Sequence, residues 1–326
     1  MIKVLRPRGL FMKHANYSIE NTIAMKAGYR NLLQQNDFKD SEIVRSLQSH
    51  SCHIYMICSR PKILFRKSSL HFGRDCYRVG YDYFKNGKEY SEEYNFPNTL
   101  GFSNYKLNEA CNRIQIMDEK GKILTDGKSS LLYVSSIPEY KEILDLKILY
   151  IGQAFGENGK RLAAERLSSH STLQQIYADF MDNNPNEEIW LILWEFAPYL
   201  ISMLGSIGID AIHDFDESVE QYQKVNDTPI PLDQQITVIE AALIKYFSPR
   251  YNIEYKSTFP ASSHSSYQIC YQLDFNNIAF ELDTKSIYTR LYSDTIKPNF
   301  FHLSNFFLHS GTDRKNMFNI GDIFNI

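Results

Sequence analysis

The order of apolar segments between residues 131 and 252 constrains the fold more than any other feature of this chain. Short apolar runs with the length of strands alternate there with stretches that repeat apolar residues at helical spacing. Strands and helices that follow each other in this way pack into mixed layers. The unit is therefore predicted to be α+β, a small antiparallel sheet flanked by helices, with strands at 131–134, 148–152 and 189–196 and helices at 161–169, 173–181 and 234–247.

The segments on either side of this unit predict mostly strands. Two helices are expected first, and Asn86-Gly87 then predicts a tight turn between two strands. The helices are placed at 17–36 and 41–48. After a serine-rich loop, strand-like runs are expected at 267–275, 278–282 and 287–292, and an aromatic-rich stretch at 300–307 closes the tail. The chain divides into an N-terminal helix plus β-rich domain suited to substrate or partner recognition (1–127), the central unit (128–256) and a small C-terminal β-rich segment (257–326).

Charge and cysteine content exclude several classes of protein. A net charge of −3 and an isoelectric point near 6.3 do not fit a protein that coats nucleic acid through bulk positive charge. Five scattered cysteines without a C-x-x-C pair argue against a zinc site and a disulfide framework, and they fit a reducing cytosol. No secretory signal is visible, and the most apolar segment contains Glu195 and Pro198, so a cytoplasmic protein without a membrane partner is expected.

Six polar residues follow one another through the central unit: Tyr133, Tyr150, Arg166, His170, Glu240 and Asn252. Tyr150 opens a Tyr-Ile-Gly triplet, and the pairs at 166 and 170 and at 240 and 252 are four and twelve positions apart. This order resembles the GIY-YIG nuclease superfamily, and its details are closest to the restriction endonuclease branch. The chain differs in its first triplet, where Leu131-Leu132-Tyr133 stands in place of Gly-Ile-Tyr, and in an insertion at 198–233.

The resemblance implies an endonuclease that hydrolyses DNA with Mg²⁺ or Mn²⁺. Glu240 would anchor the metal ion, because one hard carboxylate suffices when water and phosphate oxygens complete the coordination. Arg166 offers a planar fork of donors to phosphate, and His170 lies one helical turn further along the same side. Tyr133 is implied as the general base with Tyr150 as its positioning partner, and Asn252 as a structural residue that bonds nearby backbone.

Gly152, Lys160 and Arg161 complete the predicted site on the substrate side. A cation at Lys160 or Arg161 could lower the pKa of a phenol, about 10 when unperturbed, toward that of a working base. Because a duplex has two strands and a monomer has one site, a homodimer or a regulatory protein is an attractive partner beside DNA itself. By analogy with the branch that the chain resembles, restriction or another antiviral defence is the expected role.

Each of these residues also has an ordinary structural interpretation. Alone, the tyrosines would be strand residues, Arg166 and His170 a solvated helix face, and Glu240 half of a salt bridge. Two other functions stay open: a non-catalytic module that keeps the fold to bind nucleic acid or a protein, and a nuclease directed at RNA. The glycines after position 151 lack the Lys-Ser/Thr of a phosphate loop, and the acidic residues at 210–217 fit a solvated loop better than a metal site.

Overall fold

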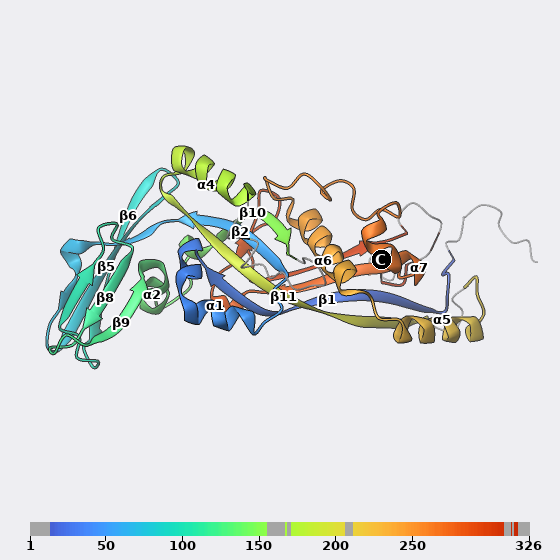
Figure 1. Ribbon diagram of the computed structural model, residues 1–326, viewed down its shortest axis with the longest axis horizontal. Coiled ribbons are helices and arrows are strands. Elements are labelled where there is room, and N and C mark those ends of the chain that lie inside the picture. The colour runs from blue at the N-terminus through green and yellow to red at the C-terminus, as the bar shows by residue number, and fades with distance from the viewer. Residues whose placement is uncertain are drawn as a thin grey trace, which may run out of the picture.

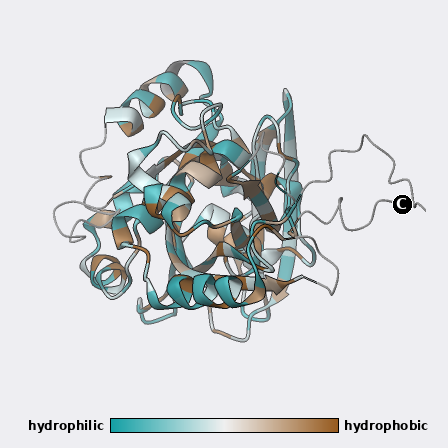
Figure 2. Ribbon diagram, turned by 90° about the vertical axis from the view of Figure 1, so that its right-hand side faces the viewer, coloured by the Kyte–Doolittle hydropathy of each residue, from teal (hydrophilic) through white to brown (hydrophobic). Residues whose placement is uncertain are grey.

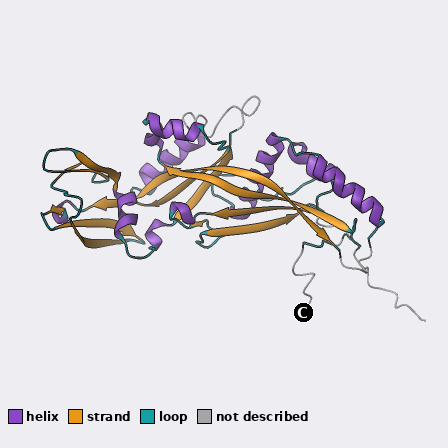
Figure 3. Cartoon of the chain, turned by 90° about the horizontal axis from the view of Figure 1, so that it is seen from below, coloured by secondary structure: helices purple, strands orange, loops and turns teal. Residues whose placement is uncertain are grey.

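The computed structural model describes residues 14–154, 167, 171–205, 211–309, 314 and 316–318. Within these residues the fold is α+β, built on one curled, mixed sheet of seven strands with two small antiparallel sheets and six α-helices. The strands of the large sheet run along much of the length of the molecule (Figures 1 and 3). The predicted α+β class is confirmed.

The large sheet draws its strands from all three parts into which the sequence was divided. Two of its pairs, β1 with β12 and β10 with β13, are parallel, and the others are antiparallel. The expected small antiparallel sheet is therefore wrong in size and in pairing, because strands of the first and last segments join those of the central unit. In spatial order the strands are β13 (Leu291–Tyr292), β10 (Leu146–Gln153), β2 (Ile54–Pro61), β11 (Glu187–Leu204), β1 (Ile19–Leu33), β12 (Asn277–Asp283) and β14 (Phe301–Phe307).

β1 overturns the helix that was expected at 17–36. It lies between β11 and β12 and pairs with both. Most of its side chains are buried or half-buried, and Ile23 and Met25 belong to the core on one face of the sheet. A central strand that is buried on both faces has a nearly continuous apolar sequence, and a helix can produce the same pattern. Pairing with two neighbours outweighs the local helical pattern here.

The described residues contain α1 (Ser41–Gln48), α2 (Ser129–Ser136), α4 (Ser171–Asn183), α5 (Phe215–Asp227), α6 (Leu232–Phe247) and α7 (Gln268–Gln272). Three of them, α1, α4 and α6, confirm predicted helices. Two replace strands: α2 stands where 131–134 was expected as a strand, and α7 where 267–275 was. Short apolar runs fit a buried helix as well as a strand, which explains both errors. No helix in the described part of the chain is long and apolar enough to cross a bilayer.

Helices cover both faces of the sheet, and each face has its own core. On one face Ile239 of α6 packs in a core with Trp190 of β11. On the other face α1 and α4 enclose a core that contains Tyr55 of β2 and Leu173 of α4. Hydrophobic segments accordingly gather in the interior in the end-on view of Figure 2. The free energy of this burial, about 25 cal/mol for each Å² of apolar surface, holds the layers together.

Residues 62–145 form what we call the inserted module, because the chain leaves the large sheet after β2 and rejoins it at β10. The module lies at one end of the molecule and has a separate core (Figure 1). Asn86 and Gly87 have φ values of 51° and 76°, as the predicted two-residue turn requires. Besides α2, the module contains β3 (Ile63–Phe65), β4 (His71–Phe72), β5 (Cys76–Lys85), β6 (Lys88–Pro97), β7 (Asn104–Leu107), β8 (Arg113–Met117) and β9 (Ile123–Lys128).

Candidate functional site

The antiparallel pairing of β2 with β10 brings two tyrosines together on one face of the sheet. Gly152 is opposite Tyr55 in the register, and the register shifts between Ile148 and Tyr150. The ring centroids of Tyr55 and Tyr150 are 6.2 Å apart, with an angle of 34° between the rings. Both rings pack in the core under α4, where Tyr55 is fully buried and Tyr150 half-buried.

Gly152 is the position that makes this arrangement possible. A Cβ atom added there would lie 2.5 Å from the hydroxyl oxygen of Tyr55 and 2.8 Å from Cε1 of Tyr150. Both distances are far below van der Waals contact, so any larger residue would displace the two rings. The glycine of the Tyr150-Ile151-Gly152 triplet therefore provides the space into which the phenol of Tyr55 fits.

The outer edge of β10 is closed by side-chain and backbone bonds from the segment after α6. β13 pairs only with Leu146 and Lys147 at the beginning of β10. Further along, the Oδ1 atom of Asn252 accepts from the Ile151 amide at 2.9 Å, and its Nδ2 atom donates to the Ile151 carbonyl at 2.8 Å. The Tyr251 amide donates to the carbonyl of Leu149 at 3.0 Å. Asn252 thus has the structural position that the resemblance implies, where its amide group substitutes for a neighbouring strand.

Glu240 lies on α6, the helix that packs against β10. Glu240 is only 8% exposed, which is unusual for a carboxylate, and its chain neighbours Ile239 and Ala241 are apolar and buried. Ile239 and His53 line the same small cavity, and the His53 ring Nδ1 lies 2.8 Å from the carbonyl oxygen of Ala154. This turn of α6 is therefore beside the start of β2, and α6 packs on the face of the sheet opposite to the core that holds the two tyrosine rings.

A buried carboxylate of this kind fits a divalent metal ion. Carboxylate oxygen is a ligand that Mg²⁺ prefers, and Mg²⁺ retains several waters, so one protein ligand and substrate phosphate can complete its shell. Among the residues that the structure describes, no group of three or more His, Cys, Asp or Glu could hold a metal. The pKa of Tyr255 is raised to about 12, first by burial and then by the negative charge of Glu240.

Tyr251 connects the edge of β10 to α4. Its hydroxyl donates to a carboxylate oxygen of Asp179, and the guanidinium carbon of Arg250 lies 5.7 Å from the centre of its ring. Burial and this hydrogen bond raise the pKa of Tyr251 to about 12. The segment that includes Asn252 is therefore attached on one side to β10 and on the other to the helix above the tyrosine pair.

Tyr133 is not in this site, and its predicted position beside Tyr150 is wrong. It lies in α2 of the inserted module, so it is on no strand that could pair with β10. Its hydroxyl donates to Glu92 at 2.8 Å. Burial and this bond to a carboxylate raise the pKa of Tyr133 well above its ordinary value. A phenol in this setting keeps its proton and does not serve as a base.

Four predicted residues, Lys160, Arg161, Arg166 and His170, lie outside the described residues. Leu167, between Arg166 and His170 in the sequence, is helical and is buried in the same core as Tyr55. The helix expected at 161–169 therefore has one described residue, Leu167. It lies in the same core as the rings of Tyr55 and Tyr150.

Tyr55 is the site residue that the sequence analysis missed. A signal was present, because His53-Ile54-Tyr55 shares its last two residues with the Gly-Ile-Tyr triplet. The inserted module hid it, since Tyr55 and Tyr150 are 95 positions apart (150 − 55). No protein-family model, curated protein or solved structure matches the chain. The described residues of the candidate site are the phenols of Tyr55 and Tyr150, Gly152 with the space that it leaves, the side-chain amide of Asn252 and the buried carboxylate of Glu240.

Proposed function

We propose that this protein is a metal-dependent endonuclease of the GIY-YIG type that hydrolyses phosphodiester bonds in DNA. The observation that carries the proposal is the contact between Tyr55 and the Tyr150-Ile151-Gly152 triplet across paired strands. Tyr55 takes the part that the sequence pattern gave to Tyr133. Glu240, on α6, and Asn252, in the segment after α6, extend the same pattern.

In the proposed reaction one of the two phenols, as the phenolate, takes a proton from the attacking water. The water oxygen forms its bond to phosphorus, and the leaving oxygen departs with the electron pair of the bond that breaks. Tyr55 is the stronger choice for the base because its hydroxyl lies at the glycine gap. A cation beside the phenol is needed to lower its pKa, and Lys160, Arg161 and Arg166 are the residues that the motif offers.

Glu240 would hold Mg²⁺ or Mn²⁺, which when bound supplies positive charge to the phosphate oxygens. Arg166, if it follows the motif, would add a planar pair of donors to the same oxygens. The two tyrosines then orient water on one side of the phosphorus atom. Preorganised charge and orientation of this kind account for most of the rate enhancement in phosphoryl chemistry.

The inserted module is proposed to contribute substrate choice. A site formed by two strands and one helix contacts too little nucleic acid to read much sequence, and base contacts come from additional elements. The chain enters and leaves the module through the two strands of the site, at the end where Ser59 pairs with Lys147, and Tyr55 and Gly152 pair near the other end of these strands. Restriction or another antiviral defence is the biological role that we propose for such an enzyme.

Plasmid nicking tests the proposal. Supercoiled DNA is incubated with the protein in Mg²⁺, in EDTA, and with the variant Glu240→Gln. We expect cleavage in Mg²⁺ alone, with the variant slower by about a hundredfold or more because it loses the metal ligand. Glu220→Gln, an exposed carboxylate on α5, is the matched control and should cleave at the full rate. Equal cleavage under all of these conditions would contradict the metal assignment, and cutting of matched RNA in preference to DNA would change the substrate.

A further inference from the structure

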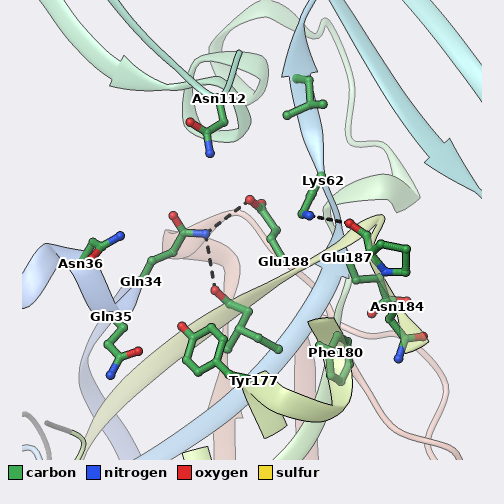
Figure 4. Close-up of a pocket in the computed structure, with 13 residues that line it drawn as sticks. Gln34, Gln35, Asn36, Lys62, Asn112, Tyr177, Phe180, Asn184, Glu187 and Glu188 are labelled. Carbon is green, nitrogen blue, oxygen red and sulfur yellow. Dashed lines mark hydrogen bonds between the residues drawn. The ribbon is translucent and has the colours of Figure 1, made fainter. Parts of the chain in front are cut away.

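A pocket of about 490 Å³ lies where the large sheet meets the inserted module. Its walls come from the residues just after β1, from α4 and the turn that follows, from the start of β11, and from β3 with the residue before it and the loop before β8. Figure 4 shows the side chains of Gln34, Asn112 and Tyr177 on separate segments around the same space. The volume is within the range of sites for small organic ligands.

Carboxamide groups dominate the polar lining of this pocket. They belong to Gln34, Gln35, Asn36, Asn112 and Asn184. Gln34 is held in place, since its Nε2 atom donates to Glu188 at 3.3 Å and to the carbonyl of Ile189 at 3.4 Å. A carboxamide carries a donor and an acceptor in one plane, which is the pattern that pairs with the edge of a nucleobase, and Asn112 accepts from Asn108 through its Oδ1 atom.

Two aromatic rings from α4 supply flat apolar surface. Tyr177 and Phe180 are three residues apart on the helix, so they project from the same side. Burial raises the pKa of Tyr177 to about 12, so its hydroxyl remains a donor at neutral pH. Stacking on such a ring is favourable for any base, because every base has a flat face.

The charges of the pocket disfavour a phosphate. Its one cation, Lys62, already donates to the carbonyl of Pro185, and two carboxylates, Glu187 and Glu188, also line it. Arg60 pairs with Glu188 at 3.3 Å, so Glu187 is the carboxylate that would repel a ligand with an anionic group. A neutral, planar molecule with several donors and acceptors matches the lining better.

We propose that this pocket binds a nucleobase. The choice of a base among neutral heterocycles rests on the proposed nuclease function, and the base could belong to an unpaired nucleotide of the substrate strand or to a free nucleoside. α4 connects the pocket to the candidate site, because Tyr177 and Phe180 line the pocket while Asp179 accepts from Tyr251 at the edge of β10. A bound base would thus lie on the same helix that fixes the site.

Fluorescence of 2-aminopurine tests the proposal. The probes are free 2-aminopurine riboside and a DNA duplex with one unpaired 2-aminopurine, both titrated in EDTA so that no cleavage occurs. We expect quenching on the ring of Tyr177 and binding weakened by about tenfold in Asn184→Ala and in Asn112→Ala, from the loss of one base-edge contact. Asn186→Ala, in the same turn as Asn184 but outside the pocket lining, should bind like the unchanged protein.

Each outcome has a defined meaning. Binding of the duplex alone assigns the base to the substrate strand, and binding of the riboside alone assigns a free nucleoside. Binding of neither probe, or equal weakening by Asn186→Ala, overturns the pocket. Circular dichroism of every variant separates lost binding from lost folding. A protein that nicks plasmid but binds neither probe loses only this inference, and one that binds a probe without nicking loses only the proposed nuclease function.

Discussion

Tyr55 and Tyr133 are both fully buried, yet the surroundings of their phenols differ in kind. The hydroxyl of Tyr133 donates to Glu92, a carboxylate that also accepts from an ammonium group and from two further tyrosines. The ring of Tyr55 lies beside the ring of Tyr150 and against Gly152, which has no side chain. Residue type and burial therefore do not separate a structural tyrosine from one proposed to act in catalysis, whereas the groups around the hydroxyl do.

Glu92 and the four side chains that donate to it, Tyr83, Tyr94, Tyr133 and Lys141, form what we call the carboxylate hub of the inserted module. This hub explains why Tyr133 is structural. Burial alone would raise the pKa of Glu92, but hydrogen bonds from Lys141, Tyr94 and Tyr133 outweigh it and lower this pKa to about 2. Glu92 therefore stays ionised, and its partners stay protonated. The hub fixes the hairpin of β5 and β6 to α2 through tyrosine hydroxyls that donate their protons to Glu92 in hydrogen bonds.

Substitution of the two tyrosines should have opposite consequences, and this is the largest effect that we expect. Tyr55→Phe should slow DNA cleavage by about a hundredfold or more, the usual contribution of a general base. Tyr133→Phe should leave the cleavage rate unchanged and lower the free energy of unfolding by about 1.5–3 kcal/mol, from one lost hydrogen bond to a charged group. Initial rates of plasmid nicking and urea unfolding curves measure both. A reversed result, with Tyr133→Phe the slower enzyme, would return the base to the inserted module.

Gly152 offers a second way to test the tyrosine pair. In Gly152→Ala the new methyl group would overlap both rings, so we expect cleavage to fall about tenfold to a hundredfold as the reacting groups move. The same overlap should cost about 1–3 kcal/mol in stability.

The matched control for this change is Gly28→Ala. Gly28 is also a strand residue of the large sheet, but the nearest atom to its added Cβ is the Glu195 carbonyl oxygen at 3.7 Å, an ordinary contact. Its cleavage rate should not change. If Gly152→Ala cuts as fast as Gly28→Ala, the phenol of Tyr55 has no part in the reaction.

The sequence predicted the elements of the site better than their assembly. Tyr150, Gly152 and Asn252 lie together as predicted because they are bound to one strand and to the segment at its edge, and both have strong local patterns. The partner of Tyr150 could not be found from spacing, because the strand that pairs with β10 precedes the inserted module. Pairing between distant strands depends on tertiary contacts that no local window contains.

The same limit accounts for the errors in the fold. The segment at 17–36 has apolar residues at spacings that suit a helix, but two neighbouring strands make it β1. The run at 131–134 was too short to separate a strand from a helix, and contacts with the hub made it part of α2. α6 was predicted well because sixteen residues of helical periodicity end at a left-handed Ser248 before Pro249.

The smallest effect concerns Glu92 and should appear in stability without any change in cleavage. Glu92→Gln removes the charge to which the hub donates, so unfolding at pH 7 should become easier by about 1–3 kcal/mol, as for hydrogen bonds to a charged group. Because folding lowers the pKa of Glu92 from 4.5 to about 2, the stability it contributes is present above pH 4.5 and is lost as the pH falls toward 2. The difference between the unchanged protein and the variant should therefore shrink over that window, while Glu89→Gln, an exposed residue of the same strand, should show no difference at any pH.

Unfolding curves at pH 7, 4 and 3 measure this difference in stability. A difference that grows on acidification, or a loss of nicking in a folded Glu92→Gln protein, would mean that the hub acts in the reaction. The contrast between the two tyrosines would then be drawn in the wrong place.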